Sequence, residues 1–287
     1  MKVLYVSGAT GADYQCDLVM HGLRSLLGPD LVDVNKMWFM YDTSEHYMFH
    51  SLYKLLPDIE VDRGEVEEKI RRHHFDAVVF GSAHRCRSYL DLVASVYPAS
   101  KIAFIDGEDG PELCSDALGR GWYWKRELYS PDSRVMPIQF GIPKEKIRPI
   151  DMDRKNRGPV FAPCNPMDRS TYQYYDSETR YYDQYSDAWF GITMRKGGWD
   201  CMRHYEIIAS GTVPYFIDIE QCPPDTLALL PRDPLLRARR LADPGRWQDS
   251  DHDRTTWWWI MDELHQVLVK HLTTEAHAKR ILEKLSQ

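Results

Sequence analysis

The side chains with the clearest capacity for chemistry lie in a glycine-containing segment between residues 194 and 216. Its pattern predicts a strand, a Lys-Gly-Gly loop at 196–198, a helix over 202–210 and a second strand. Arg203 and Glu206 are three residues apart and therefore share one helical face. Basic side chains and backbone N–H groups at a helix N-terminus suit a pyrophosphate, and a carboxylate beside them can accept both hydroxyls of a ribose. The segment thus predicts a nucleotide-diphosphate site made of Lys196, Gly197, Gly198, Arg203, Glu206 and Thr212.

Residues 186–232 resemble the donor-binding half of GT-B glycosyltransferases, particularly their exostosin-like and fucosyltransferase-like branches. The family pattern is a basic residue, a Glu, a helix of small residues, and Gly-x-Val-Pro leading into a strand. It is matched here by Arg203, Glu206, Ala209, Gly211, Val213 and Pro214. The resemblance implies that Lys196 and Arg203 hold the diphosphate of a nucleotide sugar and that Glu206 holds its ribose. The alternative is a tight turn at 211–214, with Arg203 and Glu206 forming a surface ion pair.

One departure from the family pattern bears on stereochemistry. Many retaining GT-B enzymes carry a Glu eight positions before the ribose-binding one, and Gly198 occupies that position here. The resemblance therefore favours inversion. Inverting members stabilise the departing diphosphate with a helix dipole and basic side chains rather than with a metal. We accordingly expect a nucleotide diphosphate sugar as donor substrate, no obligatory cofactor and no metal site.

An inverting transfer also needs a base that removes the proton of the acceptor hydroxyl. Candidate bases occur in three polar turns that follow predicted strands, at 7–13, 80–85 and 106–110. Three carboxylates crowd the last of these turns, and mutual repulsion there would raise the pKa of one of them. We favour Asp109 and then Asp13, ahead of Glu108 and His84.

The same acidic turn supports a different interpretation. Asp106, Glu108 and Asp109 offer the hard oxygen ligands that Mg²⁺ prefers, which would suit a metal-dependent hydrolase. Asp151 and Asp153 reproduce the Asp-x-Asp of metal-dependent GT-A enzymes, but in a proline-rich connection rather than after an apolar strand.

A tyrosine-rich stretch precedes the predicted nucleotide segment. Aromatic rings with hydroxyl groups suit the apolar faces and hydroxyls of a sugar, so we predict an acceptor-binding role for three of these tyrosines. The alternative is packing of an irregular segment at the junction of two lobes. The stretch comprises Tyr172, Tyr174, Tyr175, Tyr181, Tyr182 and Tyr185, of which Tyr181, Tyr182 and Tyr185 are the predicted acceptor contacts.

The elements that must position these residues alternate between short apolar strands and helices. Strands are predicted at 3–6, 31–34, 77–80 and 101–105, with helices between them, which indicates a parallel sheet covered on both faces. Ligands of such sheets bind at the carboxyl ends of the strands. The predicted fold class is α/β, with two Rossmann-like, GT-B-like lobes and a C-terminal helical tail. The predicted domains are an acceptor lobe at 1–148, a nucleotide-sugar lobe at 149–254 and a tail at 255–287 that packs back across both lobes.

Composition limits the class of protein. The 287 residues carry a formal net charge of −7, which argues against non-specific nucleic-acid binding. No run approaches the roughly 20 apolar residues of a membrane span. The six cysteines are widely spaced, without a metal-binding pattern, which predicts reduced thiols and a cytoplasmic protein.

The sequence therefore predicts a glycosyltransferase that moves a sugar to an acceptor hydroxyl. The acceptor is a glycan, a small molecule or, as in some phage enzymes, a modified nucleic acid. Two other classes stay open: a non-catalytic nucleotide-sugar-binding module, and a metal-dependent hydrolase built on the turn at 106–109.

Overall fold

Six short strands form one parallel sheet in the first lobe of the computed structural model, which describes residues 1–8, 11–174, 176–243 and 245–287. Their order across the sheet is β2-β1-β3-β4-β5-β6. This order begins like that of flavodoxin-like sheets, whose direction of winding reverses between β1 and β3. The strands are β1 (Val3–Val6), β2 (Leu31–Asp33), β3 (Ala77–Phe80), β4 (Ile102–Asp106), β5 (Trp122–Lys125) and β6 (Val135–Pro137).

The four strands predicted for this lobe are present, and β5 and β6 are two that the pattern does not reveal. Strand β5 ends in a lysine and β6 ends in a proline, so neither forms a purely apolar run. Both are short, and no α-helix lies between β4 and β6. The alternation of strand and helix on which the prediction rests therefore stops at β4.

Three helices accompany this sheet, and α1 is the longest. Asp13 caps α1 (Tyr14–Leu27) by accepting a hydrogen bond from the Cys16 backbone N–H at 3.3 Å. Gly28 ends the helix with φ of +54°, a conformation that favours glycine. The other two are α2 (Val66–Arg71) and α3 (Leu90–Val96).

The second lobe is built around a much smaller sheet. Its strands β7 (Phe190–Thr193) and β8 (Val213–Phe216) are parallel, and Phe161 adds a single bridge beside Phe190. The lobe is α/β as predicted, but it has fewer strands than a full Rossmann sheet. Its helices are α4 (Met152–Arg157), α5 (Glu178–Ser186), α6 (Met202–Ala209) and α7 (Arg232–Leu241). Single-turn 3₁₀ helices lie at Gly28–Asp30, Trp38–Met40, Ala99–Lys101, Lys144–Lys146, Arg169–Thr171 and Ile219–Gln221.

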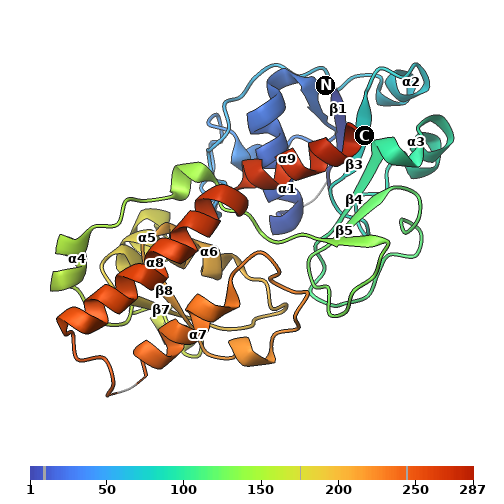
Figure 1. Ribbon diagram of the computed structural model, residues 1–287. Coiled ribbons are helices and arrows are strands. Elements are labelled where there is room, and N and C mark those ends of the chain that lie inside the picture. The colour runs from blue at the N-terminus through green and yellow to red at the C-terminus, as the bar shows by residue number, and fades with distance from the viewer. Residues whose placement is uncertain (9–10, 175, 244) are drawn as a thin grey trace.

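The C-terminal tail consists of two helices. Helix α8 (Asp251–His271) packs on the second lobe, where buried Trp257 donates its indole N–H to the Trp189 carbonyl at 2.8 Å. Helix α9 (Thr274–Leu285) crosses to the first lobe and packs along α1 (Figure 1). A Cβ atom at Gly22 would lie 2.0 Å from the Thr274 carbonyl oxygen, so α1 and α9 approach almost backbone to backbone.

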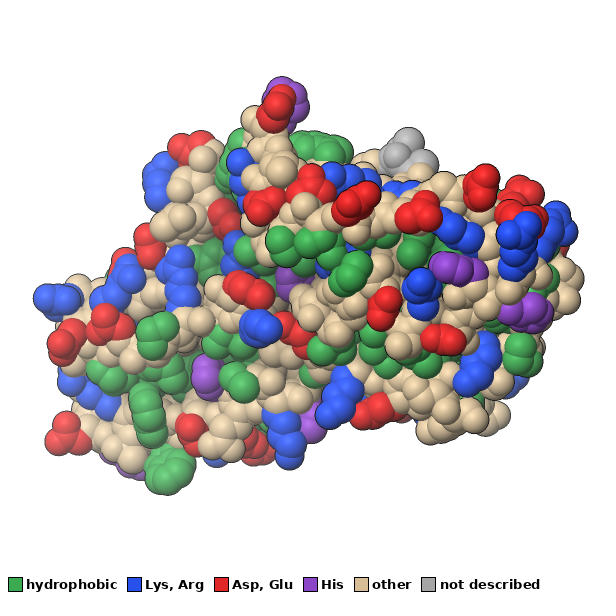
Figure 2. Space-filling view, turned by 90° about the horizontal axis from the view of Figure 1, so that it is seen from above, with side chains coloured by type: hydrophobic (Ala, Val, Ile, Leu, Met, Phe, Trp, Pro, Cys, Tyr) green, Lys and Arg blue, Asp and Glu red, His purple; other side chains and the backbone are tan. Residues whose placement is uncertain are grey.

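Two surface properties follow from the described residues. Acidic and basic side chains are interspersed over the face of the molecule shown in Figure 2. No helix in the described parts of the chain has both the length and the apolarity to cross a membrane.

One charged side chain lies deep within the second lobe. The Lys155 amine is fully buried and donates to the Ala188 carbonyl at 2.7 Å and to the Thr212 hydroxyl at 3.1 Å. Burial lowers the pKa of Lys155 to about 7. In the unfolded chain, the Lys155 amine has a pKa of about 10.4.

This burial predicts a pH-dependent contribution to stability. Between about pH 7 and pH 10 the unfolded chain binds more protons at Lys155 than the folded chain, so this contribution to stability rises with pH. We expect the stability of wild type relative to Lys155→Met to increase by about 1 kcal/mol per pH unit in this window. Urea unfolding of both proteins at pH 7 and pH 9 measures the difference. A stability difference that is the same at both values would contradict the buried, neutral amine.

Candidate functional site

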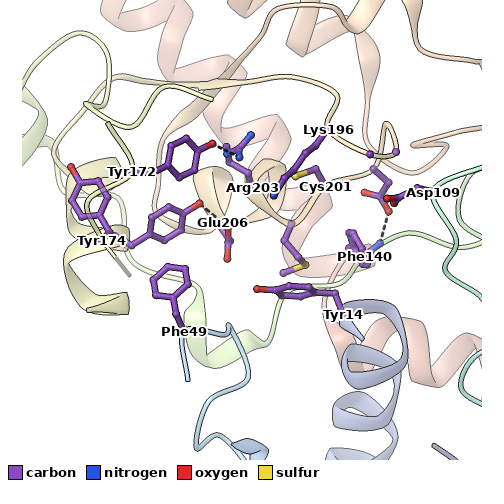
Figure 3. A pocket seen from close by; sticks show the side chains of 15 residues that line it. Tyr14, Phe49, Asp109, Phe140, Tyr172, Tyr174, Lys196, Cys201, Arg203 and Glu206 are labelled. Atoms are coloured by element: carbon purple, nitrogen blue, oxygen red, sulfur yellow. Dashed lines mark hydrogen bonds between the residues drawn. The ribbon is translucent and has the colours of Figure 1, made fainter. Parts of the chain in front are cut away.

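A cavity of about 600 Å³ lies between the two lobes, on the side where the strands of the first sheet end. The first lobe contributes Tyr14, Phe49, Asp109 and Phe140. The second contributes the 196–203 loop and helix start, Glu206 and three tyrosines. Figure 3 shows Arg203, Glu206 and Lys196 on one wall, with Tyr14 and Phe49 opposite them. The structure thus brings together the segment predicted to bind a nucleotide and one of the predicted bases.

Arg203 is a buried cation in this wall. Its side chain donates from Nη2 to the Tyr172 hydroxyl, whereas Nε and Nη1 have no hydrogen-bond partner among the described residues. A guanidinium buried without a carboxylate is costly unless an anion completes it. The described structure records no ion pair between Arg203 and Glu206, so the alternative of a surface ion pair is wrong.

Glu206 is the buried carboxylate of the cavity. It accepts hydrogen bonds from the Ser51 hydroxyl at 2.7 Å and the Tyr181 hydroxyl at 2.9 Å. Burial raises the pKa of Glu206, although both hydrogen bonds oppose the shift. Ser51 belongs to the first lobe, so Glu206 joins the two lobes as well as facing the cavity.

Of the three tyrosines predicted to contact the acceptor, one lines the cavity and two do not. Tyr181 lines the cavity and orients Glu206. Tyr182 and Tyr185 are buried outside the lining, in an apolar cluster behind it, where the Tyr182 hydroxyl lies 3.5 Å from the Glu206 carboxylate. Tyr175 lies outside the described residues, as do residues 9 and 10 of the first polar turn.

The two glycines of the 196–198 loop are explained by contact between the lobes. A Cβ atom at Gly198 would lie 2.3 Å from the Glu127 carboxylate, and one at Gly197 would lie 2.0 Å from the Asp109 carboxylate. Both glycines also line the cavity, next to exposed Lys196. Thr212 does not line it: its buried hydroxyl donates to the Tyr185 carbonyl at 2.5 Å.

A buried polar junction holds the lobes together at the end of this loop. The Asp200 carboxylate accepts from the Phe140 backbone N–H at 2.7 Å and from the Tyr205 hydroxyl at 2.6 Å. Arg126 donates to the Asp200 carbonyl at 2.6 Å, and the Glu127 carboxylate accepts from the Asp200 N–H at 2.9 Å. Burial raises the pKa of Asp200 to about 6.

Sequence reasoning does not identify Arg126 and Glu127 as part of the site. They directly follow β5, which the strand pattern does not reveal, and the run Lys125-Arg126-Glu127 is the only sequence signal they leave. Charged residues that follow a buried strand are the expected occupants of a ligand edge. The run Lys125-Arg126-Glu127 therefore indicates a ligand site only when β5 is known to be a strand.

The candidate bases occupy different places. Asp109 lines the cavity and forms an ion pair with Arg126. Asp13 and Glu108 both pair with Arg85, at 2.7 and 3.0 Å, and neither lines the cavity. His84 also lies outside the lining, with Nε2 3.1 Å from the Asp106 carboxylate. Of the four candidates, only Asp109 is placed to meet a ligand of this cavity.

The acidic turn is not arranged as a cluster of carboxylates. Asp106 is fully buried and pairs with Lys125 at 2.9 Å, while Glu108 and Asp109 pair with two different arginines. Within the described ranges, no three His, Cys, Asp or Glu side chains are grouped to hold a metal ion. Asp151 instead caps α4 by accepting from the Arg154 N–H at 3.1 Å.

Comparisons with known proteins reveal little similarity. Neither protein-family models nor curated protein sequences give a match. Among solved structures, the chain is similar to an alpha-glucosyltransferase in complex with UDP and a 13-mer DNA containing an HMU base. The TM-score is 0.48 at 10% sequence identity, over 99% of this chain and 99% of that chain.

The contact at Gly198 generates a stability prediction. The carboxylate that would meet a new Cβ at 198 belongs to Glu127 and is fully buried, whereas the Asp109 side chain near Gly197 is 65% exposed and can move aside. We expect Gly198→Ala to destabilise the protein by about 1–3 kcal/mol, and Gly197→Ala by less than about 0.5 kcal/mol. Chemical unfolding of the two variants measures the contrast. An equal loss of unfolding free energy in the two variants would show that the Glu127 side chain moves aside as easily as that of Asp109.

Proposed function

We propose that the protein is a nucleotide-sugar glycosyltransferase whose donor binds in the cavity between the lobes. The observation that carries this proposal is buried Arg203, with two unpartnered nitrogen atoms, one helical turn before buried Glu206 in the same cavity. A guanidinium binds phosphate oxygens through charge-assisted hydrogen bonds, and a carboxylate accepts the two hydroxyls of a ribose. Lys196 supplies a second cation from the loop.

The geometry supports a division of roles between the lobes. Arg203 and Lys196 would neutralise the charge that develops on the departing diphosphate, without an obligatory metal. Asp109 approaches the cavity from the first lobe and would take the proton of the acceptor hydroxyl as the sugar carbon is attacked. A single displacement of this kind inverts the anomeric carbon. The chain resembles exostosin-like and fucosyltransferase-like donor segments, but it has Gly198 where many retaining GT-B enzymes carry a Glu. This difference agrees with inversion.

The other classes receive less support from the described residues. A hydrolase built on the turn at 106–109 would need converging carboxylates, but each of these carboxylates contacts a cation. A pure binding module would have no use for a carboxylate opposite the diphosphate cations. Slow hydrolysis of the donor separates an enzyme from a binder, and retained activity in EDTA separates it from a metal-dependent hydrolase.

Donor binding is tested with Arg203→Leu. A thermal-shift panel of nucleotides and nucleotide sugars first identifies the ligand, because binding raises the melting temperature. We expect Arg203→Leu to weaken that ligand by about 2 kcal/mol, or roughly 30-fold in Kd, because a charge-assisted bond to phosphate is lost. The matched control is Arg157→Gln, which removes an exposed arginine that does not line the cavity. If Arg203→Leu and Arg157→Gln bind the nucleotide equally well, the donor site is not here.

The assignment of the base is tested with Asp109→Asn. We expect kcat to fall by roughly 10²–10⁴ while the Kd for the nucleotide stays within about threefold, because the amide fills the same space but cannot take a proton. Glu108→Gln is the comparison, since Glu108 lies in the same turn but outside the cavity lining. An equal loss in both variants would rule out Asp109 as the base. The configuration of the product, read by NMR, tests inversion.

A further inference from the structure

A second cavity of about 410 Å³ adjoins the first. The two share Tyr172, Lys196 and Arg203 in their walls. Two further arginines belong to the second cavity alone: Arg169, from the loop before α5, and Arg195, from the loop after β7. Neither Glu206 nor Asp109 lines it. The ribose site and the candidate base therefore belong to the first cavity only.

The charges around the second cavity are all of one sign. Arg169, Arg195, Lys196 and Arg203 line it, without any carboxylate. The Asp218 carboxylate, which does not line the cavity, accepts a hydrogen bond from the Arg195 backbone N–H at 3.2 Å. The Arg195 guanidinium lies over the Trp199 ring, 5.2 Å from the centroid, and the two remaining donors of Arg203 are unpartnered. Four cations around one hollow create a positive potential that favours an anion.

The number of cations exceeds what a sugar nucleotide needs. Each phosphate of the donor diphosphate carries a single negative charge, and Arg203 and Lys196 at the shared wall match the pair. Arg169 and Arg195 line the second cavity alone, so they stay available for another anion once Arg203 and Lys196 have paired with the diphosphate. A phosphate ester carries up to about two negative charges, which two arginines can pair with.

We infer that the second cavity binds a phosphate ester of the acceptor, so that an acceptor hydroxyl extends into the first cavity toward the donor and Asp109. The inference rests on the proposed function, and it goes further by naming the chemical class of the acceptor. Arg169 and Arg195 are the positioning residues for that phosphate. The ester is either the monoester of a small phosphorylated sugar or a phosphodiester of a nucleic-acid strand, and both present anionic phosphate oxygens to these arginines.

The test uses the whole chain, saturated with the nucleoside diphosphate that stabilises it most. Three probes are then added separately: inorganic phosphate, glucose 6-phosphate, and a labelled single-stranded DNA of roughly 12 nucleotides. Thermal shift reads the first two probes and fluorescence anisotropy reads the DNA. The proteins compared are wild type, Arg169→Gln/Arg195→Gln and the control Arg157→Gln, which removes one exposed arginine that lines neither cavity. The probe that binds identifies the source of the ester.

We expect wild type and Arg157→Gln to bind at least one ester probe, and the double variant to bind it roughly tenfold or more weakly, with an unchanged Kd for the nucleotide. Equal binding by the double variant, or no binding of any probe by wild type, overturns the inference. A parallel loss of nucleotide affinity also overturns it, because the cavity would then belong to the donor. If no nucleotide binds wild type, the proposed function fails, while the probes added alone still report on the second cavity.

Discussion

The junction around Asp200 determines how the two lobes meet. Its backbone N–H and carbonyl are bound by Glu127 and Arg126 of the first lobe, while its carboxylate accepts the Phe140 N–H. Three groups of one residue thus hold the end of the 196–198 loop against the first sheet. Because these groups are buried, breaking any one bond leaves a polar atom without water or partner, which makes the junction a strong constraint on geometry. The position of Arg203 and Glu206 relative to Asp109 depends on it.

This constraint also explains why the loop contains a glycine at position 198. In a phosphate-binding loop, glycine is usually interpreted as making room for the ligand. Here the space that a side chain would fill at 197 and 198 is already occupied by the carboxylates of Asp109 and Glu127. Gly198 therefore lets the second lobe lie against buried Glu127 of the first lobe, whereas the exposed Asp109 side chain beside Gly197 can move aside. The glycine loop thus lies where a phosphate-binding loop is expected, but the glycine at 198 is required by contact between the lobes rather than by a ligand.

The sequence reveals those parts of the molecule that depend on local pattern. Strands β1 to β4 and helix α6 follow from apolar periodicity, and the shared face of Arg203 and Glu206 follows from helical spacing. What it does not reveal depends on contacts between distant segments. Arg126 reaches Asp200 across 74 residues, and Ser51 reaches Glu206 across 155. The same reason accounts for Tyr182, Tyr185 and Thr212, whose residue types suit a site but whose buried side chains do not line the cavity.

The packing of α9 along α1 has a consequence for the order of events during synthesis. The hydrogen bond between His21 and Thr274 joins residues separated by 253 positions. Until Thr274 leaves the ribosome, the face of α1 that contains Gly22 has no covering helix, although every strand of the first sheet has already been made. A nascent chain keeps that face of α1 uncovered until helix α9 has been made. Its first lobe is therefore the last to be completed, and a chaperone that binds apolar helices would find its target there.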